Sequence, residues 1–141
     1  MSVLYTPDML GLAASLARYP LDKNFTVRAS SRSKTCGSSL TIGLELATSD
    51  SIQSVGLQVT ACAIGQSSAA ILARNAKGVS PQRIRETYDG LRAWLEGRGD
   101  LPNWPELAIL APAQDRPGRH GALLLPWEAA VSALSSYEPA R

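Results

Sequence analysis

Two cysteines are the residues of this chain with the most distinctive chemistry. Cys36 stands in the segment KTCGS (34–38), and Cys62 stands in TACAIG (60–65). Gly37 lets the backbone adopt angles that other residues avoid, so the first thiol can stand on an exposed turn near Lys34. The second thiol lies where a strand gives way to a helix, and the free N–H groups of a helix start favour a thiolate. The contexts predict two reactive thiols, and two buried small hydrophobic residues are the other interpretation.

The elements on either side of the cysteines predict how two remote thiols could meet. Apolar residues alternate with polar or small ones over 40–47 and over 55–60, and the segment TSDS (48–51) between them is turn-like. Cys36 precedes the first of these strands and Cys62 follows the second. In antiparallel neighbours the start of one strand lies beside the end of the next. We therefore expect both thiols at one end of a sheet.

The other elements complete an α+β pattern. A strand is predicted over 25–30, and a first helix starts at Thr6-Pro7 and stops before Pro20. Further helices are predicted from Ala61 to the Lys77-Gly78 pair, over 80–97, and after 120, where Pro126 bends or restarts the helix; the segment 101–115 has room for one short turn around 106–109. This order predicts an α+β domain over 1–141, with helices packed on one face of a three-stranded antiparallel sheet.

These segments resemble the IscU/NifU N-terminal family of iron–sulfur cluster assembly scaffolds, and most closely its SufU-like members. That family has a first Cys-Gly-Asp, a second Gly-Cys-Ala-Ile-Ser and a third Arg-x-x-Cys-Ala-x-Leu-x-Trp motif. The resemblance implies an IscU/SufE-like fold and gives Cys36 and Cys62 the positions of the first two ligand cysteines. It covers roughly residues 25 to 135.

The ligand set is degenerate when compared with this family. Ser38 stands at the position of the aspartate, and Ala122 stands at that of the third cysteine, with Arg119 and Trp127 matching around it. The flanking Gly and Ser of the second motif are also replaced, here by Ala61 and Gly65. An iron–sulfur cluster or a structural zinc ion needs about four ligands.

His120, the only histidine, is the next metal ligand available. It is two residues before Ala122, whereas some relatives have a histidine directly before the third cysteine. Cys36, Cys62 and His120 could hold a metal together with water, Asp115 or a group from a partner, or two subunits could pool their thiols. The other interpretation of His120 is an exposed loop residue.

The resemblance implies a scaffold or carrier and not an enzyme. Such a protein receives sulfur from a cysteine desulfurase, binds iron or an iron–sulfur cluster, and passes it to an acceptor protein. Zinc in place of iron, or no cofactor at all, is also compatible with the incomplete ligand set. Two alternatives stay open: a non-catalytic interaction or zinc-binding module that docks a desulfurase, and a SufE-like accessory that relays sulfur as a persulfide.

Composition excludes several other classes. The chain of 141 residues carries a net charge of +2 with scattered basic residues and few aromatic ones, which argues against nucleic-acid binding. No apolar run approaches the ~18–20 residues of a membrane span, and the start lacks a basic signal region, so we expect a cytoplasmic monomer or homodimer. Nucleotide-binding and hydrolase motifs are missing. The three tryptophans are expected in the core or at a partner, and the basic residues of 83–98 on a solvated helix face.

Overall fold

The computed structural model describes residues 6–34 and 37–137. Helices and strands follow one another as the sequence predicts, with three short 3₁₀ segments (η) added. Their bounds are α1 (Pro7–Ser15), η1 (Leu16–Arg18), β1 (Val27–Arg32), β2 (Ser39–Leu46), β3 (Ile52–Thr60), α2 (Ala63–Arg74), α3 (Pro81–Leu95), η2 (Leu107–Asp115), η3 (Pro117–Arg119) and α4 (His120–Ser135).

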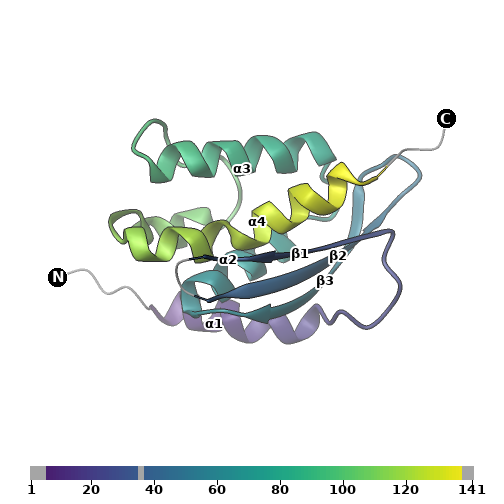
Figure 1. Cartoon of the computed structure of the whole chain (residues 1–141), viewed down its shortest axis with the longest axis horizontal. Helices are drawn as coiled ribbons and strands as arrows, with labels where there is room; N and C mark the ends of the chain where they lie inside the picture. The colour runs from purple at the N-terminus through teal and green to yellow at the C-terminus, as the bar shows by residue number, and fades with distance from the viewer. Residues whose placement is uncertain (1–5, 35–36, 138–141) are drawn as a thin grey trace.

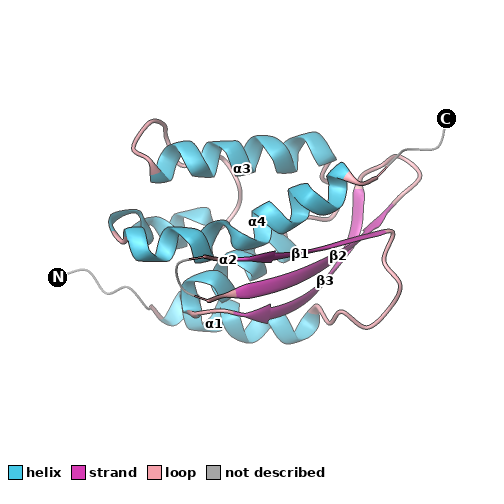
Figure 2. Cartoon of the chain, in the orientation of Figure 1, coloured by secondary structure: helices cyan, strands magenta, loops and turns pink. Residues whose placement is uncertain are grey.

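The three strands form one antiparallel sheet in the order β1-β2-β3 (Figures 1 and 2). Helix α4 packs against β1 and β2, α2 packs against β3, and these two helices also pack against each other. Helix α3 lies on α4, and α1 lies on α2. The predicted α+β class with a three-stranded antiparallel sheet is confirmed. In the described part of the chain, no helix is long and apolar enough to cross a membrane.

Alternation along β2 and β3 produces the buried face of the sheet. Ile42 pairs with Leu57, and Leu44 pairs with Val55; all four side chains are at most 8% exposed. Because side chains alternate between the two faces of a strand, the residues between them face the other side. The helices of one layer therefore cover a continuous apolar surface.

Phe25 departs from the prediction that it begins a strand. Strand β1 begins only at Val27, and the ring of Phe25 lies over Gly43 and Gly56, which are paired across β2 and β3. A Cβ at Gly43 would lie 2.4 Å from Phe25 Cδ2, and one at Gly56 would lie 2.3 Å from its Cζ. The two glycines thus open a place for an aromatic ring on the outer face, and burying this ring outweighs the alternating pattern.

The starts of α1 and α3 and the end of α3 agree with the capping signals in the sequence, whereas α2 ends at Arg74, three residues before the predicted stop at Lys77-Gly78. Thr6 Oγ1 accepts the N–H of Met9 at 3.2 Å, and Ser80 Oγ accepts the N–H of Arg83 at 3.2 Å. Gly97 follows α3 with a φ of 76°, as glycine does after many helices. Helix α4 continues through Pro126, so this proline neither ends nor restarts it.

The segment 101–115 is more ordered than predicted. A 3₁₀ stretch of nine residues runs over Leu107–Asp115, although only one short turn was expected around 106–109. Glu106 starts it with a φ of 73°, and its carboxylate accepts hydrogen bonds from Arg74 Nε at 2.9 Å and Asn75 Nδ2 at 3.1 Å. Three apolar residues at threefold spacing then face the core, as a 3₁₀ helix requires: Leu107, Leu110 and Ala113.

Candidate functional site

Cys62 lies at the junction between β3 and α2, as predicted. It is the N-cap residue of α2, with an extended backbone (φ −68°, ψ 173°), and its side chain is half-buried. The thiol makes no capping hydrogen bond to the described helix. Gln66 holds the junction instead, because its N–H bonds to the Cys62 carbonyl at 2.9 Å and its Nε2 donates to the Ala61 carbonyl at 2.9 Å. The start of α2 therefore does not use the Cys62 thiol as a capping group.

Ser38 lies at the same end of the sheet as Cys62. The last pair between β2 and β3 joins Ser39 to Thr60, so the residues just before Ser39 and just after Thr60 are neighbours. Ser38 is 4% exposed, and its carbonyl accepts the N–H of Ser33 at 2.8 Å. Cys36 itself lies outside the described residues. The meeting of the two thiols stays a prediction, and the register of the strands supports it.

Ala122, at the position of the missing third cysteine, lies against the helix that Cys62 begins. It is completely buried in the first turns of α4. A Cβ built on Gly65 of α2 would lie 3.4 Å from Ala122 Cβ, 3.3 Å from the Ala122 carbonyl oxygen and 2.7 Å from Ala61 Cβ. The second and third motifs therefore meet in space, and small side chains fill their contact.

Trp127 fixes α4 to α2 beyond this contact. Its indole is completely buried and donates a hydrogen bond to Ser68 Oγ at 3.0 Å, while Ser68 donates to the Leu123 carbonyl at 2.6 Å. The ring also meets Trp104 edge to face, with centroids 4.9 Å apart. Trp94, Trp104 and Trp127 are at most 6% exposed, so their predicted place in the core is confirmed. Together these bonds set the position of the α4 start relative to Cys62.

His120 is the first residue of α4 and is half-buried, so it is not the fully exposed loop residue of the other interpretation. Its Nε2 lies 2.8 Å from the carbonyl oxygen of Gln114. Because a carbonyl only accepts, Nε2 is the donor in this contact, and Nδ1 is the ring nitrogen left for another partner. Asp115, the last residue of η2, is exposed, and Arg119 directly before the helix is half-exposed.

The described residues do not by themselves form a metal site. Across 6–34 and 37–137, no three His, Cys, Asp or Glu side chains converge closely enough to hold an ion. The predicted trio of Cys36, Cys62 and His120 includes a residue outside those ranges, so it stays a prediction. Any site would have to be completed by Cys36, by water or by a partner.

A cavity of about 400 Å³ opens beside the segment that leads to Cys36. The end of β1 and the start of α4 form its walls, and Ser31 Oγ joins these elements by a hydrogen bond to Glu128 at 2.7 Å. No local pattern predicts this cavity, because its residues come from two distant segments: Arg32, Ser33, Lys34, Pro117, Gly121, Leu124, Leu125 and Glu128. The cavity lies at the end of the sheet where Arg32 pairs with Ser39 and Ser39 pairs with Thr60.

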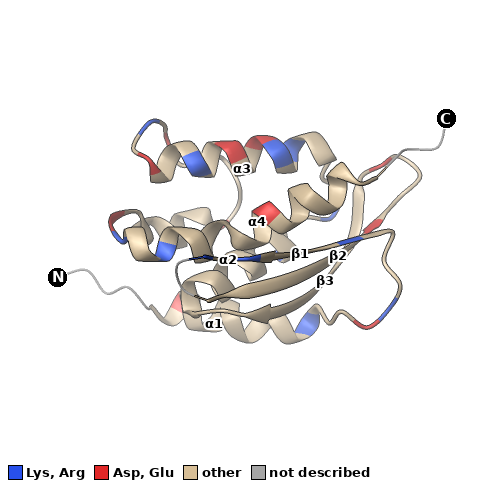
Figure 3. Cartoon of the chain, in the orientation of Figure 1, with Lys and Arg blue, Asp and Glu red and all other residues tan. Residues whose placement is uncertain are grey.

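Charged residues elsewhere are distributed as a solvated surface. Figure 3 shows acidic and basic residues interspersed along α3, whereas the central strands carry few charges. The predicted solvated face is confirmed, because all four of its arginines are exposed: Arg83, Arg85, Arg92 and Arg98.

Ser68, which joins Trp127 and Leu123 of α4 to α2 by hydrogen bonds, is a residue that the sequence analysis missed. Its only signal is a small polar residue on the buried side of a helix.

The chain resembles two solved structures over nearly its whole length. The N-terminal part of a nitrogen-fixing NifU-like protein from Brucella abortus matches with a TM-score of 0.86 and 26% identity, over 94% of this chain and 92% of that one. A candidate scaffold protein for iron–sulfur cluster assembly by the SUF system, from Fervidobacterium islandicum, matches with a TM-score of 0.84 and 19% identity, over 93% and 96%. No protein-family model and no curated protein matches the chain.

The second of these likenesses shows the fold alone, and the first adds sequence identity along the same alignment. The fold also brings the second and third sequence motifs together at one site, at Gly65 and Ala122. By its fold and by the arrangement of these motifs, the chain is similar to IscU/NifU N-terminal, SufU-like proteins.

Proposed function

We propose that this protein is a scaffold or carrier of iron–sulfur cluster assembly, which takes sulfur from a cysteine desulfurase and iron or a cluster on Cys36 and Cys62. The observation that carries the proposal is the position of Cys62. Cys62 is the half-buried N-cap residue of α2, and it lies at the end of the sheet to which the β2–β3 register also leads the segment of Cys36. The overall likeness to iron–sulfur assembly proteins supports the same role.

The bound iron or cluster, called the cargo below, would be held by fewer protein ligands than in the complete family pattern. Ala122 offers no donor atom, and Ser38 offers a hydroxyl where the family has a carboxylate. His120 can add one nitrogen, Nδ1, if its ring approaches the thiols. The protein therefore depends on a second chain, water or the acceptor protein to complete the coordination, which favours short residence of the cargo.

Removal of either thiol is expected to abolish most of the iron binding. After anaerobic reconstitution with iron, sulfide and a cysteine desulfurase, the wild type should show thiolate-to-iron absorption, and Cys36→Ala and Cys62→Ser should show little. Ser49→Ala, in the exposed β2–β3 turn, is the control and should equal the wild type. Equal absorption in the wild type and in both cysteine variants would refute the proposal.

Restoring the third thiol should strengthen the site. Ala122→Cys adds a sulfur atom beside the start of α2, and each added ligand slows metal loss, so we expect iron retention against a chelator to rise about tenfold. The new sulfur costs about 1 kcal/mol of stability because the position is fully packed. Val131→Cys, farther along α4, is the matched control. If both variants retain iron equally, Ala122 does not adjoin the cargo.

The packing of Ala122 also favours a second function, a docking module without cargo. A buried methyl group at the third ligand position is what a protein that has lost cluster binding would carry. On that hypothesis, a cysteine desulfurase is retained equally by the wild type and by a variant with both cysteines changed to serine. A persulfide trapped by mass spectrometry on one cysteine would instead indicate sulfur relay.

A further inference from the structure

The outer edge of strand β3 is covered at two points, Ile52 and Leu57, and is open between them. At one end, the N–H of Leu57 bonds to the Tyr19 carbonyl at 2.8 Å. At the other end, Ile52 bonds through its N–H to Val79 at 2.9 Å and through its carbonyl to Gly78 at 2.7 Å. Between these two closures lies a stretch of about four residues, or ~13 Å of strand.

The backbone of Val55 faces this open stretch. In an antiparallel pair, alternate residues direct both their N–H and their C=O toward the partner strand or away from it. Leu57 directs its N–H away from β2, toward Tyr19, so Val55, two residues earlier in the same register, does likewise. No described residue bonds to Val55 across this edge. Such an unpaired edge is a template for another strand.

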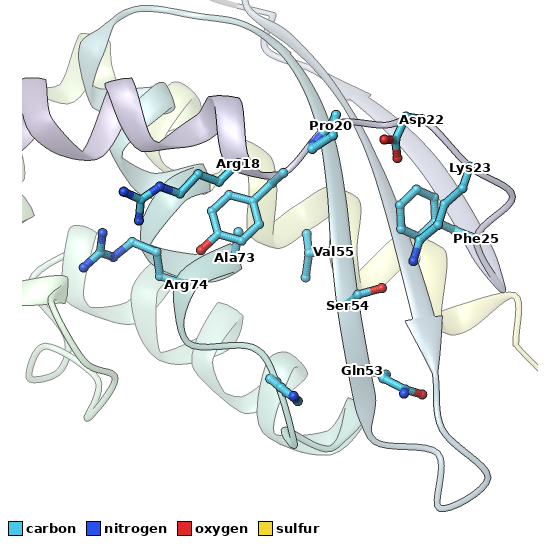
Figure 4. Close-up of a pocket in the computed structure, with 12 residues that line it drawn as sticks. Arg18, Pro20, Asp22, Lys23, Phe25, Gln53, Ser54, Val55, Ala73 and Arg74 are labelled. Carbon is cyan, nitrogen blue, oxygen red and sulfur yellow. The ribbon is translucent and has the colours of Figure 1, made fainter.

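A basic cavity of about 540 Å³ surrounds the open edge (Figure 4). Four cations line it with one acid, Asp22: they are Arg18, Lys23, Arg74 and Lys77. Lys23 lies 3.6 Å from Glu45, and the Nε of Arg74 pairs with Glu106. Arg18 and Lys77 form no ion pair with any residue in the described ranges. The cavity therefore has an excess of positive charge, which comes from Arg18, Arg74 and Lys77.

We propose that the edge of β3 at Gln53–Val55 binds a short, acidic, extended segment of a partner protein as an added strand. The exposed N–H and C=O of Val55 would pair with the segment's backbone. Because side chains of a strand alternate, its acidic residues would meet the Arg18, Arg74 and Lys77 side or the Lys23 side of the cavity. Backbone hydrogen bonds would let such a segment bind more tightly than a small anion, which could interact only with the cationic side chains.

This surface is separate from the thiol end of the sheet. The open stretch lies near the start of β3, whereas Cys62 follows the end of the same strand. Val55 and Thr60 are about 16 Å apart along an extended chain. A bound partner would leave the thiol end open, so binding here does not depend on the proposed cargo.

A fluorescent peptide tests the proposal on the full-length protein. The probe is a capped segment of about four residues that alternates glutamate and valine, which matches the length of the gap. Fluorescence anisotropy at low salt should show binding that weakens as salt is added, since charges contribute. The double variant Arg18→Ala/Lys77→Ala should weaken it about tenfold or more. The peptide should also slow hydrogen exchange of the Val55 amide.

Two controls separate strand addition from general attraction to cations. Arg85→Ala/Arg98→Ala removes the same charge from exposed positions on and just after α3 and should leave the affinity unchanged. A probe with N-methylated peptide bonds has the same charge but cannot pair as a strand, so it should bind about tenfold more weakly. Equal affinity of the methylated probe, an equal loss in the control variant, or an unprotected Val55 amide would overturn the proposal in favour of a small-anion site or nonspecific attraction.

Discussion

Trp127→Ala is expected to lower the free energy of unfolding by about 3–5 kcal/mol, the cost of deleting a large buried aromatic side chain. The residue is completely buried, meets Trp104 edge to face and donates to Ser68 Oγ at 3.0 Å. Its loss would leave a cavity between α2 and α4. Single domains are stable by about 5–15 kcal/mol, so this one change removes a large share of the total. Urea unfolding followed by circular dichroism measures it.

Trp127→Phe keeps the change measurable if the alanine variant does not fold. Phenylalanine fills most of the space but cannot donate to Ser68, whose hydroxyl still donates to the Leu123 carbonyl. We expect a loss of about 1–3 kcal/mol, intermediate between wild type and Trp127→Ala. Val131→Ala, a half-buried position on the same helix, is the control and should cost about 1 kcal/mol. A Trp127→Ala variant no less stable than this control would show that the indole does not fasten α4 to α2.

The sequence predicted most of the fold because its signals are local. Alternation in 40–47 and 55–60, the caps at Thr6 and Ser80, and the glycine after α3 each depend on a few neighbouring residues. The errors occurred where contacts between residues far apart in the sequence determine the local structure. Phe25 leaves the predicted strand because two glycines on β2 and β3 receive its ring, and η2 forms because Glu106 bonds to the end of α2.

The sequence predicted which segments of the candidate site lie close together, but it did not predict how their side chains pack. The place of Cys62 at a helix start follows from its sequence context, and the antiparallel order of the strands leads the segment of Cys36 to the same end. The roles of Ser68 and of the basic cavity beside β3 do not follow. They depend on contacts between residues that are dozens of positions apart, such as Ser68 and Leu123.

Three departures from the family pattern are physically linked in this chain. The family combines glycine before the second cysteine with serine three residues after it and a cysteine in the third motif; here Ala61, Gly65 and Ala122 occupy these positions. The Ala61 methyl group fills the space that a Cβ at Gly65 would need, and Ala122 closes over the same point. The alanine at the position of the third cysteine thus lies in the same packed contact between α2 and α4 as the other two departures.

Gly65→Ser is expected to destabilise the protein by about 1–3 kcal/mol through overpacking, although serine is the better helix former. Its Cβ would lie 2.7 Å from Ala61 Cβ and 3.3 Å from the carbonyl oxygen of Ala122. Ala61→Gly removes the closer of these two obstacles. The double variant Ala61→Gly/Gly65→Ser restores the order of residues in the family motif and should be more stable than Gly65→Ser alone. Urea unfolding of all four proteins in the cycle gives the coupling energy.

The size of this coupling decides whether Ala61 and Gly65 act as one packed unit. We expect about 1–2 kcal/mol, because residues in direct contact deviate from additivity by such amounts. Gly11→Ser on α1 is the matched control: nothing lies within 4 Å of a Cβ at that position, so helix propensity alone acts and the variant should be no less stable than wild type. Additive effects at 61 and 65 would mean that each residue changed independently. A clear coupling would mean that serine is tolerated at position 65 only when position 61 is glycine. Building a complete ligand site would then require repacking α2 against α4 as well as placing a cysteine at position 122.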